Sequence, residues 1–133
     1  MDIKIGCNTN EPQVSTRYQP RGVASFITNK LAYKIIGKGV DPTRLGRWCW
    51  TKYQGKGGKV LRVITAYRQC QIGGIKSTVV QQLRYLIKKE RLIHPRQAFM
   101  HDLHSTISIW SEAGESIIVM GDLNENIKSI NMR

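Results

Sequence analysis

The sequence has few acidic residues, few cysteines and no long apolar run, and each shortage excludes a class of protein. Its three cysteines form no CxxC pair, which argues against a disulfide framework or a zinc site and indicates buried or free thiols in a reducing compartment. No apolar stretch approaches the roughly 20 residues that cross a bilayer. The N-terminus has no basic start followed by an apolar run. We therefore expect an intracellular protein with no signal peptide, no transmembrane segment and no membrane partner.

The shortage of acidic residues leaves the chain strongly basic. Lys and Arg number 21 against 9 Asp and Glu, a formal net charge of +12. The excess lies between Arg17 and Arg96, which enclose 18 basic and two acidic residues, whereas the chain from Gln97 onward is mildly acidic. Because Lys and Arg neutralise phosphates and release counterions, this balance favours a nucleic acid partner. A basic surface that binds no nucleic acid is the alternative.

The patterning of apolar residues predicts one α/β domain over residues 1–133, with residues 1–17 poorly ordered or divergent. Apolar runs predict strands at 22–28, 32–36, 46–53, 60–67 and 116–120, and a short one at 1–7. Helical spacing predicts helices over 78–90 and about 95–113, the second begun by Pro95 and ended by Gly114. The glycine-containing segment 37–45 is expected to be a loop.

Three strands of this pattern carry specific expectations. The segment 116–120 (SIIVM) is wholly apolar, so it should lie inside a sheet. Arg62 interrupts the otherwise apolar strand 60–67 and is expected to mark an edge or a contact with solvent. Trp48 and Trp50 share one face of their strand, where packing in the core is favoured over stacking on bases.

The chemistry-bearing feature is the run from Ile117 to Glu125 (IIVMGDLNE). Residues two apart in a strand point the same way, so Asp122 and Asn124 should project together from its carboxyl end, where α/β sheets place their sites. A carboxylate at that position takes a metal or orients a water, and a carboxamide holds a phosphate oxygen. By spacing alone, an Asp-x-Asn turn is the alternative.

The wider pattern resembles the endonuclease/exonuclease/phosphatase superfamily, the fold of DNase I, in a subgroup found in retroelement-like reading frames. The resemblance rests on YQPRGVASF from Tyr18, on Gly46-Arg47-Trp48, on TAYR ending at Arg68, and on GDLN after an amphipathic helix. It covers roughly Tyr18 to Glu125. It implies an α/β (α+β) fold, namely a partial DNase I-like sheet packed by two helices, an incomplete sandwich.

The resemblance also implies hydrolysis of phosphodiesters by water and a divalent metal, usually magnesium, with DNA as the expected partner. Asp122 would orient or deprotonate the attacking water, Asn124 would hold it or the phosphate, and Tyr67 would donate a hydrogen bond to the phosphate. Arg68 and Arg47 are the candidate substrate-binding cations. The metal ligands themselves remain unassigned.

The departures from the family pattern shape the functional expectation. The metal-binding Glu of the second strand and the Asp-His pair of the last strand have no convincing match, so whether the chain is an enzyme stays open. We expect a domain fragment that is inactive alone, with a non-catalytic basic nucleic-acid-binding module as the alternative. An incomplete sheet would also expose strand edges and favour self-association.

The histidines offer a weaker alternative site. His101 and His104 lie three apart on the second predicted helix, a spacing that allows two metal ligands. Without a third ligand, exposed helix histidines are the favoured interpretation.

Overall fold

The computed structural model describes residues 2–6, 22–71, 74 and 77–125. In chain order, its elements are β1 (Asp2–Gly6), β2 (Val23–Ile27), β3 (Ile35–Val40), β4 (Trp48–Gln54), β5 (Val60–Tyr67), α1 (Thr78–Lys88), α2 (Pro95–Glu112) and β6 (Ser116–Asp122), with short 3₁₀ helices at Asn29–Lys34 and Lys56–Gly58. The expectation for residues 1–17 falls mainly outside the described residues.

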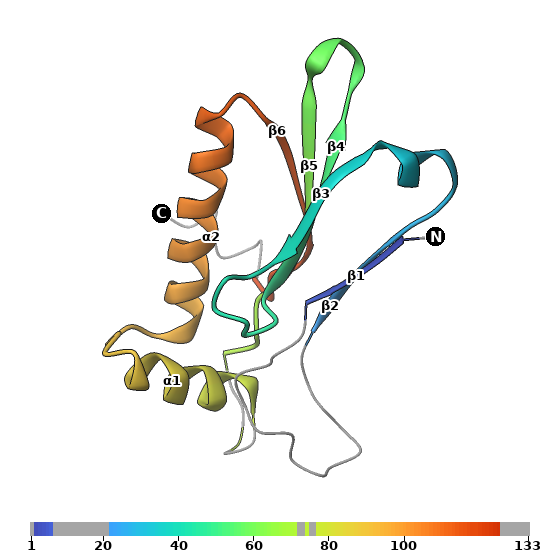
Figure 1. The fold of residues 1–133 in the computed structure, drawn as a ribbon. Helices are drawn as coiled ribbons and strands as arrows, with labels where there is room; N and C mark the ends of the chain where they lie inside the picture. Colours follow the sequence, from blue (N-terminus) through green and yellow to red (C-terminus); the bar gives the residue numbers. More distant parts are fainter. Residues whose placement is uncertain (1, 7–21, 72–73, 75–76, 126–133) are drawn as a thin grey trace.

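The elements form three layers (Figure 1). A four-stranded sheet has the order β3-β4-β5-β6, with β5 and β6 parallel and the other neighbours antiparallel. The helix α2 covers one face of this sheet, and the antiparallel pair β1–β2 lies on the other. A parallel pair needs a crossover connection, which α1 and α2 supply. The predicted α/β fold, a sheet packed by two helices, is confirmed, and the sheet is mixed.

The helix ends follow the signals in the sequence. Ser77 caps α1, its side-chain oxygen accepting a hydrogen bond from the Val80 N–H at 3.4 Å. Pro95 occupies the first turn of α2, and Gly114 follows its end with φ of +81°. Neither helix, nor any other in the described ranges, is long and apolar enough to cross a membrane.

The core lies between α2 and the sheet. It consists of Trp48, Ile64, Ala66, Phe99 and Leu103. The Trp48 and Phe99 rings meet edge to face with centroids 5.8 Å apart, and Trp50 meets Trp110 in the same way at 5.4 Å. Both tryptophans of β4 therefore pack under the helix, and the preference for core packing over base stacking is confirmed.

Arg62 is buried, so the expectation that it marks an edge or a contact with solvent is wrong. It is only 4% exposed, on an interior strand. Its guanidinium carbon lies 4.2 Å from the ring centre of Trp50 and 3.7 Å from that of Trp110. Its Nε donates to Glu115 Oε2 at 2.6 Å and its Nη2 to Oε1 at 2.9 Å. A planar cation with two aromatic faces and a bidentate carboxylate tolerates burial.

β3 also departs from expectation, because Ile35–Val40 is a strand where residues 37–45 read as a loop. The reason is close packing on Trp50. A Cβ on Gly39 would lie 2.5 Å from the Trp50 ring, so this strand needs the glycine that suggested a loop.

β6 lies at the edge of the four-stranded sheet, so the expectation of an interior position is wrong for the described residues. Strand β5 pairs with one side of it, and no described strand pairs with the other.

The Arg62–Glu115 pair predicts a specific pH dependence of stability. Hydrogen bonds from Arg62 lower the pKa of Glu115 from 4.5 to about 2. The folded state holds this carboxylate ionised, so its contribution is complete above the unfolded pKa and is lost as pH falls toward 2. Glu115→Gln should lower the free energy of unfolding by about 3 kcal/mol at pH 7.

Urea denaturation between pH 7 and pH 3 measures this effect. Glu112→Gln, an exposed glutamate at the end of α2, is the matched control and should change stability by less than about 0.5 kcal/mol. Equal stability of the Glu115 and Glu112 variants at pH 7 would contradict the prediction.

Candidate functional site

The predicted site residues come together where β5 and β6 end. The two strands are parallel, and Tyr67 pairs in register with Asp122 at their carboxyl ends. Ala66 faces the core under α2, so Tyr67 and Asp122 project from the opposite face of the sheet. The register makes them direct neighbours across the two strands.

Gly121 permits the close approach of β6 to β5 at this point. Its φ is +138°, a conformation that L side chains rarely adopt. A Cβ at this position would lie against the carbonyl oxygen of Ala66, at 1.8 Å. The glycine before Asp122 is therefore required by backbone packing.

Asp122 and Asn124 form a turn at the end of β6. The strand ends at Asp122, and Asn124 has φ of +46°. The Asn124 N–H donates to Asp122 Oδ1 at 2.9 Å, as in an Asx-type turn. Asn124 thus does not continue the alternation of strand side chains. The Asp-x-Asn turn, which the sequence allowed as an alternative, is present. The turn directs the Asn124 side chain toward the segment after β5.

The Asn124 carboxamide ties that segment to the turn. Its Nδ2 donates to the carbonyl oxygen of Arg68 at 2.6 Å, and its Oδ1 accepts from Cys70 Sγ at 3.2 Å. The Tyr67 phenol is near this carboxamide, which acts to lower the phenol's pKa. Cys70 was not singled out in the sequence, where a lone cysteine after a strand gives no signal.

Tyr67 is held as a neutral hydrogen-bonding group. Burial raises the pKa of its phenol above the ordinary 10.0, and Cys70 and Asp122 raise it further, while the hydrogen bond with Asn124 acts in the opposite direction. The net direction is upward, so the phenol remains protonated at neutral pH. It can therefore donate a hydrogen bond to an anion.

Two arginines flank this corner and share one carboxylate. Arg68 Nη1 and Arg96 Nη2 both contact Glu125 Oε2, at 2.5 Å and 2.9 Å. Arg96 Nη1 donates to the Gln69 carbonyl and its Nη2 to the Asn124 carbonyl. In the described part of the chain, buried Arg68 Nε has no hydrogen-bond partner. The predicted Arg68 is thus present, with one donor unused.

Arg96 was missed by sequence reasoning, although its position held a signal. It stands in the first turn of α2, where the helix dipole disfavours a cation. An arginine at such a position indicates a specific partner, and the structure supplies two carbonyls and a carboxylate.

Arg47 does not belong to the site, which corrects the expectation that it binds substrate. It is 1% exposed. Its Nε lies 2.6 Å from Asp41 Oδ2, and its Nη2 lies 2.9 Å from Asp102 Oδ2. A guanidinium enclosed by two carboxylates holds the loop before β4 to α2 and cannot reach a ligand.

The histidine pair offers no metal site in the described structure. His101 and His104 are both exposed on α2. Within the described ranges, no group of three His, Cys, Asp or Glu side chains could hold a metal ion.

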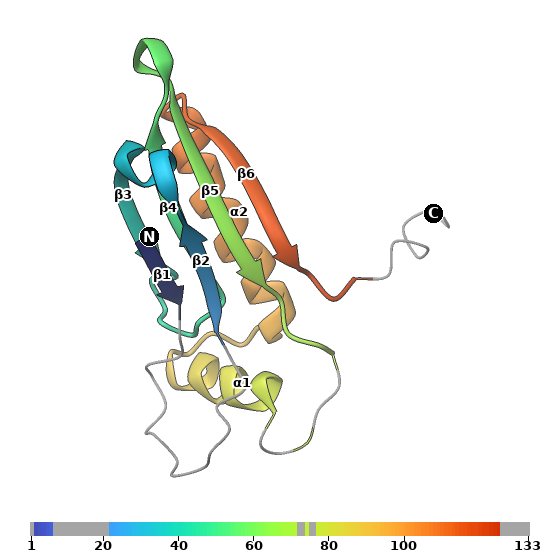
Figure 2. The same ribbon diagram turned by 90° about the vertical axis from the view of Figure 1, so that its right-hand side faces the viewer.

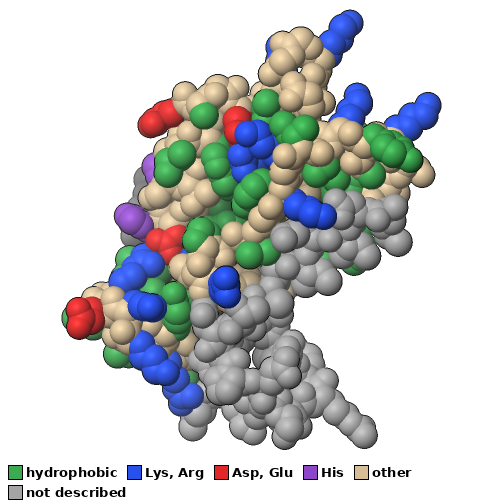
Figure 3. Space-filling view, in the orientation of Figure 1, with side chains coloured by type: hydrophobic (Ala, Val, Ile, Leu, Met, Phe, Trp, Pro, Cys, Tyr) green, Lys and Arg blue, Asp and Glu red, His purple; other side chains and the backbone are tan. Residues whose placement is uncertain are grey.

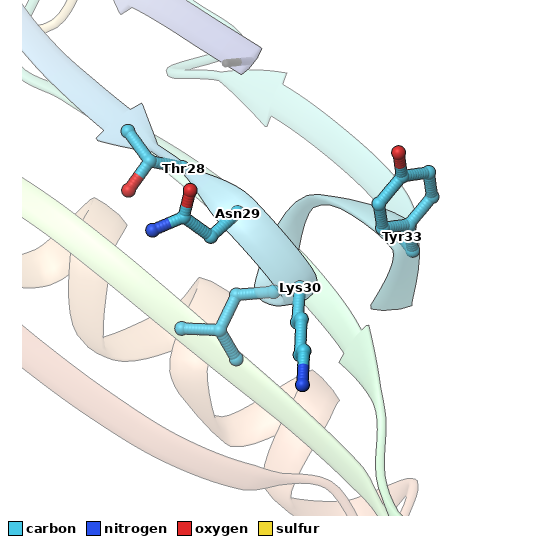
Figure 4. Close-up of a pocket in the computed structure, with 5 residues that line it drawn as sticks. Thr28, Asn29, Lys30 and Tyr33 are labelled. Atoms are coloured by element: carbon cyan, nitrogen blue, oxygen red, sulfur yellow. The ribbon is translucent and has the colours of Figure 1, made fainter.

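A separate open hollow of about 640 Å³ is lined by Thr28, Asn29, Lys30, Leu31 and Tyr33 (Figure 4). It lies beside the 3₁₀ helix between β2 and β3, at the opposite end of the sheet from the carboxyl end of β6 (Figure 2). Its lining includes one amine and one phenol but no carboxylate or imidazole. It therefore lacks the imidazole and carboxylate groups that most often serve as general acids and bases.

The close approach at Gly121 gives a testable requirement. Gly121→Ala should lower the free energy of unfolding by about 3 kcal/mol or more, because the new methyl group overlaps Ala66 backbone. Gly74→Ala is the control, since a Cβ there meets nothing within 4 Å. Urea denaturation compares the two, and equal effects would contradict the assigned strand contact.

Comparison with known proteins gives no identification. No protein-family model matches the chain, and neither does any curated protein or solved structure.

Proposed function

We propose that the carboxyl ends of β5 and β6 form the phosphate-handling corner of a phosphodiesterase-type domain, and that the described residues alone do not complete a hydrolytic site. The observation that supports the proposal is the in-register pairing of Tyr67 with Asp122. It gathers a carboxylate, a carboxamide and a neutral phenol at the edge where α/β sheets bind ligands.

Each group has a chemistry suited to a phosphate ester. Asp122 is exposed, and its carboxylate would orient or deprotonate an approaching water. Tyr67 would donate its phenolic proton in a hydrogen bond to a phosphate oxygen. Asn124 is engaged with the Arg68 carbonyl and with Cys70, so its first role is to hold the segment after β5 in place. Arg68 lies beside this corner as a further cation, with Glu125 as its partner.

Magnesium, which the family resemblance implies, is not matched by the described residues. The ion demands near-octahedral oxygen ligands and is usually bound through one or two carboxylates together with substrate phosphates. Arg68 and Arg96 hold Glu125, so among the described residues of this corner only Asp122 offers a carboxylate without an arginine. We therefore expect the chain to bind a phosphodiester without efficient cleavage.

A basic nucleic-acid-binding module is the second candidate, and the charge distribution supports it. Buried arginines pair with carboxylates, as Arg47 does with Asp41 and Arg62 with Glu115, which leaves the surface cations largely uncompensated. The exposed cations include Lys30, Lys34, Arg44, Lys56, Lys59, Arg84, Lys88 and Lys89. Figure 3 shows basic side chains in separate groups over the visible face. Such a distribution favours weak binding without sequence preference.

The first prediction from the proposal concerns hydrolysis. Supercoiled plasmid incubated with the protein and magnesium should show no nicking above the level of an Asp122→Ala variant. The described residues supply only part of the set of groups that must act together in hydrolysis. Gel electrophoresis measures this. Magnesium-dependent nicking by the natural sequence that disappears in Asp122→Ala would refute the expected inactivity.

The second prediction concerns where a phosphodiester binds. Titration with the dinucleotide TpT should shift the backbone amide signals of Tyr67, Arg68 and Asn124 in ¹H–¹⁵N NMR spectra. Tyr67→Phe should weaken binding roughly fivefold, the effect of about one lost hydrogen bond. Tyr33→Phe, an exposed phenol at the far end of the sheet, is the matched control.

The pattern of shifts separates the two candidates. Shifts confined to exposed lysines, with steep weakening by salt and no effect of Tyr67→Phe, would favour the basic module. Shifts at the corner that respond to Tyr67→Phe support the phosphate site.

A further inference from the structure

The outer side of β6 combines two features that seldom occur together. Its sequence is that of an interior strand, with four apolar residues in succession from Ile117 to Met120. Its position is that of an edge, with β5 on one side and no described strand on the other (Figure 2). An edge presents unpaired backbone N–H and C=O groups that pair readily with another strand.

The exposed side chains show how much apolar surface this leaves in water. Ile118 is 46% exposed, Val119 41% and Met120 50%. A lysine, a proline or a bulge commonly protects an edge strand from pairing with another chain. No such residue lies between Ser116 and Met120. The register with β5 is also continuous from Ser116 to Asp122.

The opposite edge of the same sheet provides an internal comparison. β3 carries Lys38, two glycines and a register shift between Ile35 and Gly37. These are the devices that discourage strand addition, and β6 lacks them.

We propose that β6 pairs antiparallel with β6 of a second copy of this chain, so that the two four-stranded sheets become one continuous sheet. The two-fold axis would pass through Val119, the middle residue of the strand, which gives the longest overlap. Because side chains alternate, this register keeps the helices of both copies on the same face.

The strand is self-complementary in this register. Ile118 of each copy lies opposite Met120 of the other, so apolar side chains meet on the face away from α2. Ser116 lies opposite Asp122, where the hydroxyl can donate to the carboxylate. No two like charges face each other along the strand.

Charge also favours this edge for a second copy. Two chains of net charge +12 repel each other over most of their surface. The strands β3, β4 and β5 contain Lys38, Lys52 and Arg62, whereas β6 contains no basic residue. Of the two edges of the four-stranded sheet, β3 carries a lysine and β6 carries no basic residue, so repulsion between two copies is lower along β6 than along β3.

The oligomeric state tests the proposal. Sedimentation analysis should find a dimer at about 100 µM protein, and Ile118→Lys should raise the dissociation constant at least roughly tenfold by placing a charge in the pairing edge. Ile36→Lys, an apolar residue 52% exposed on β3, is the matched control and should leave the dimer intact. Circular dichroism confirms that each variant folds.

A compensating pair tests the register itself. Met120→Glu alone should also weaken the dimer, whereas Ile118→Lys with Met120→Glu in one chain should restore it, because each lysine then faces a glutamate of the other copy. A monomeric natural sequence, as expected if β6 binds a strand of another protein, would overturn the proposal. So would a dimer that Ile36→Lys disrupts and Ile118→Lys does not.

Discussion

The parallel pairing of β5 with β6 is the constraint on which the candidate site depends, and buried arginines hold it at both ends. At the start of β6, Arg62 packs against two tryptophan rings and donates hydrogen bonds to Glu115 in the turn after α2. At the other end, Arg96 in the first turn of α2 bonds the carbonyls of Gln69 and Asn124, which follow β5 and β6 respectively. The crossover helix is thereby fastened to the strands it connects, and their register sets Tyr67 beside Asp122.

The buried arginines affect how the net positive charge is distributed between the interior and the surface. The basic excess suggests a surface made for polyanions, yet Arg47 and Arg62 are buried and pair with carboxylates inside the molecule. Their partners are carboxylates that would otherwise offset the surface lysines. The internal ion pairs therefore raise the share of exposed charge that is positive.

Local signals in the sequence predicted the helices and most strands, because caps, helix-ending glycines and β-branched runs act over a few residues. The corrections come from contacts between distant segments. Gly39 suggested a loop but makes room for Trp50, and Arg62 suggested solvent but meets two aromatic rings and a carboxylate more than 50 residues away. In the site, strand order brought Tyr67 and Asp122 together as expected, whereas the pairing of Arg47 with Asp102 depends on tertiary structure that no local pattern encodes.

The steric demand at Gly121 has a consequence for how the Gly-Asp-Leu-Asn run should be weighed. The Ala66 backbone leaves no room for a methyl group at position 121, so a glycine is required where the two strands approach closely. A protein that had lost all chemistry but kept this strand contact would still retain it. Only the two polar members of the run can carry information about catalysis, and a glycine followed by an apolar spacer is a mark of architecture that an inactive descendant would inherit unchanged.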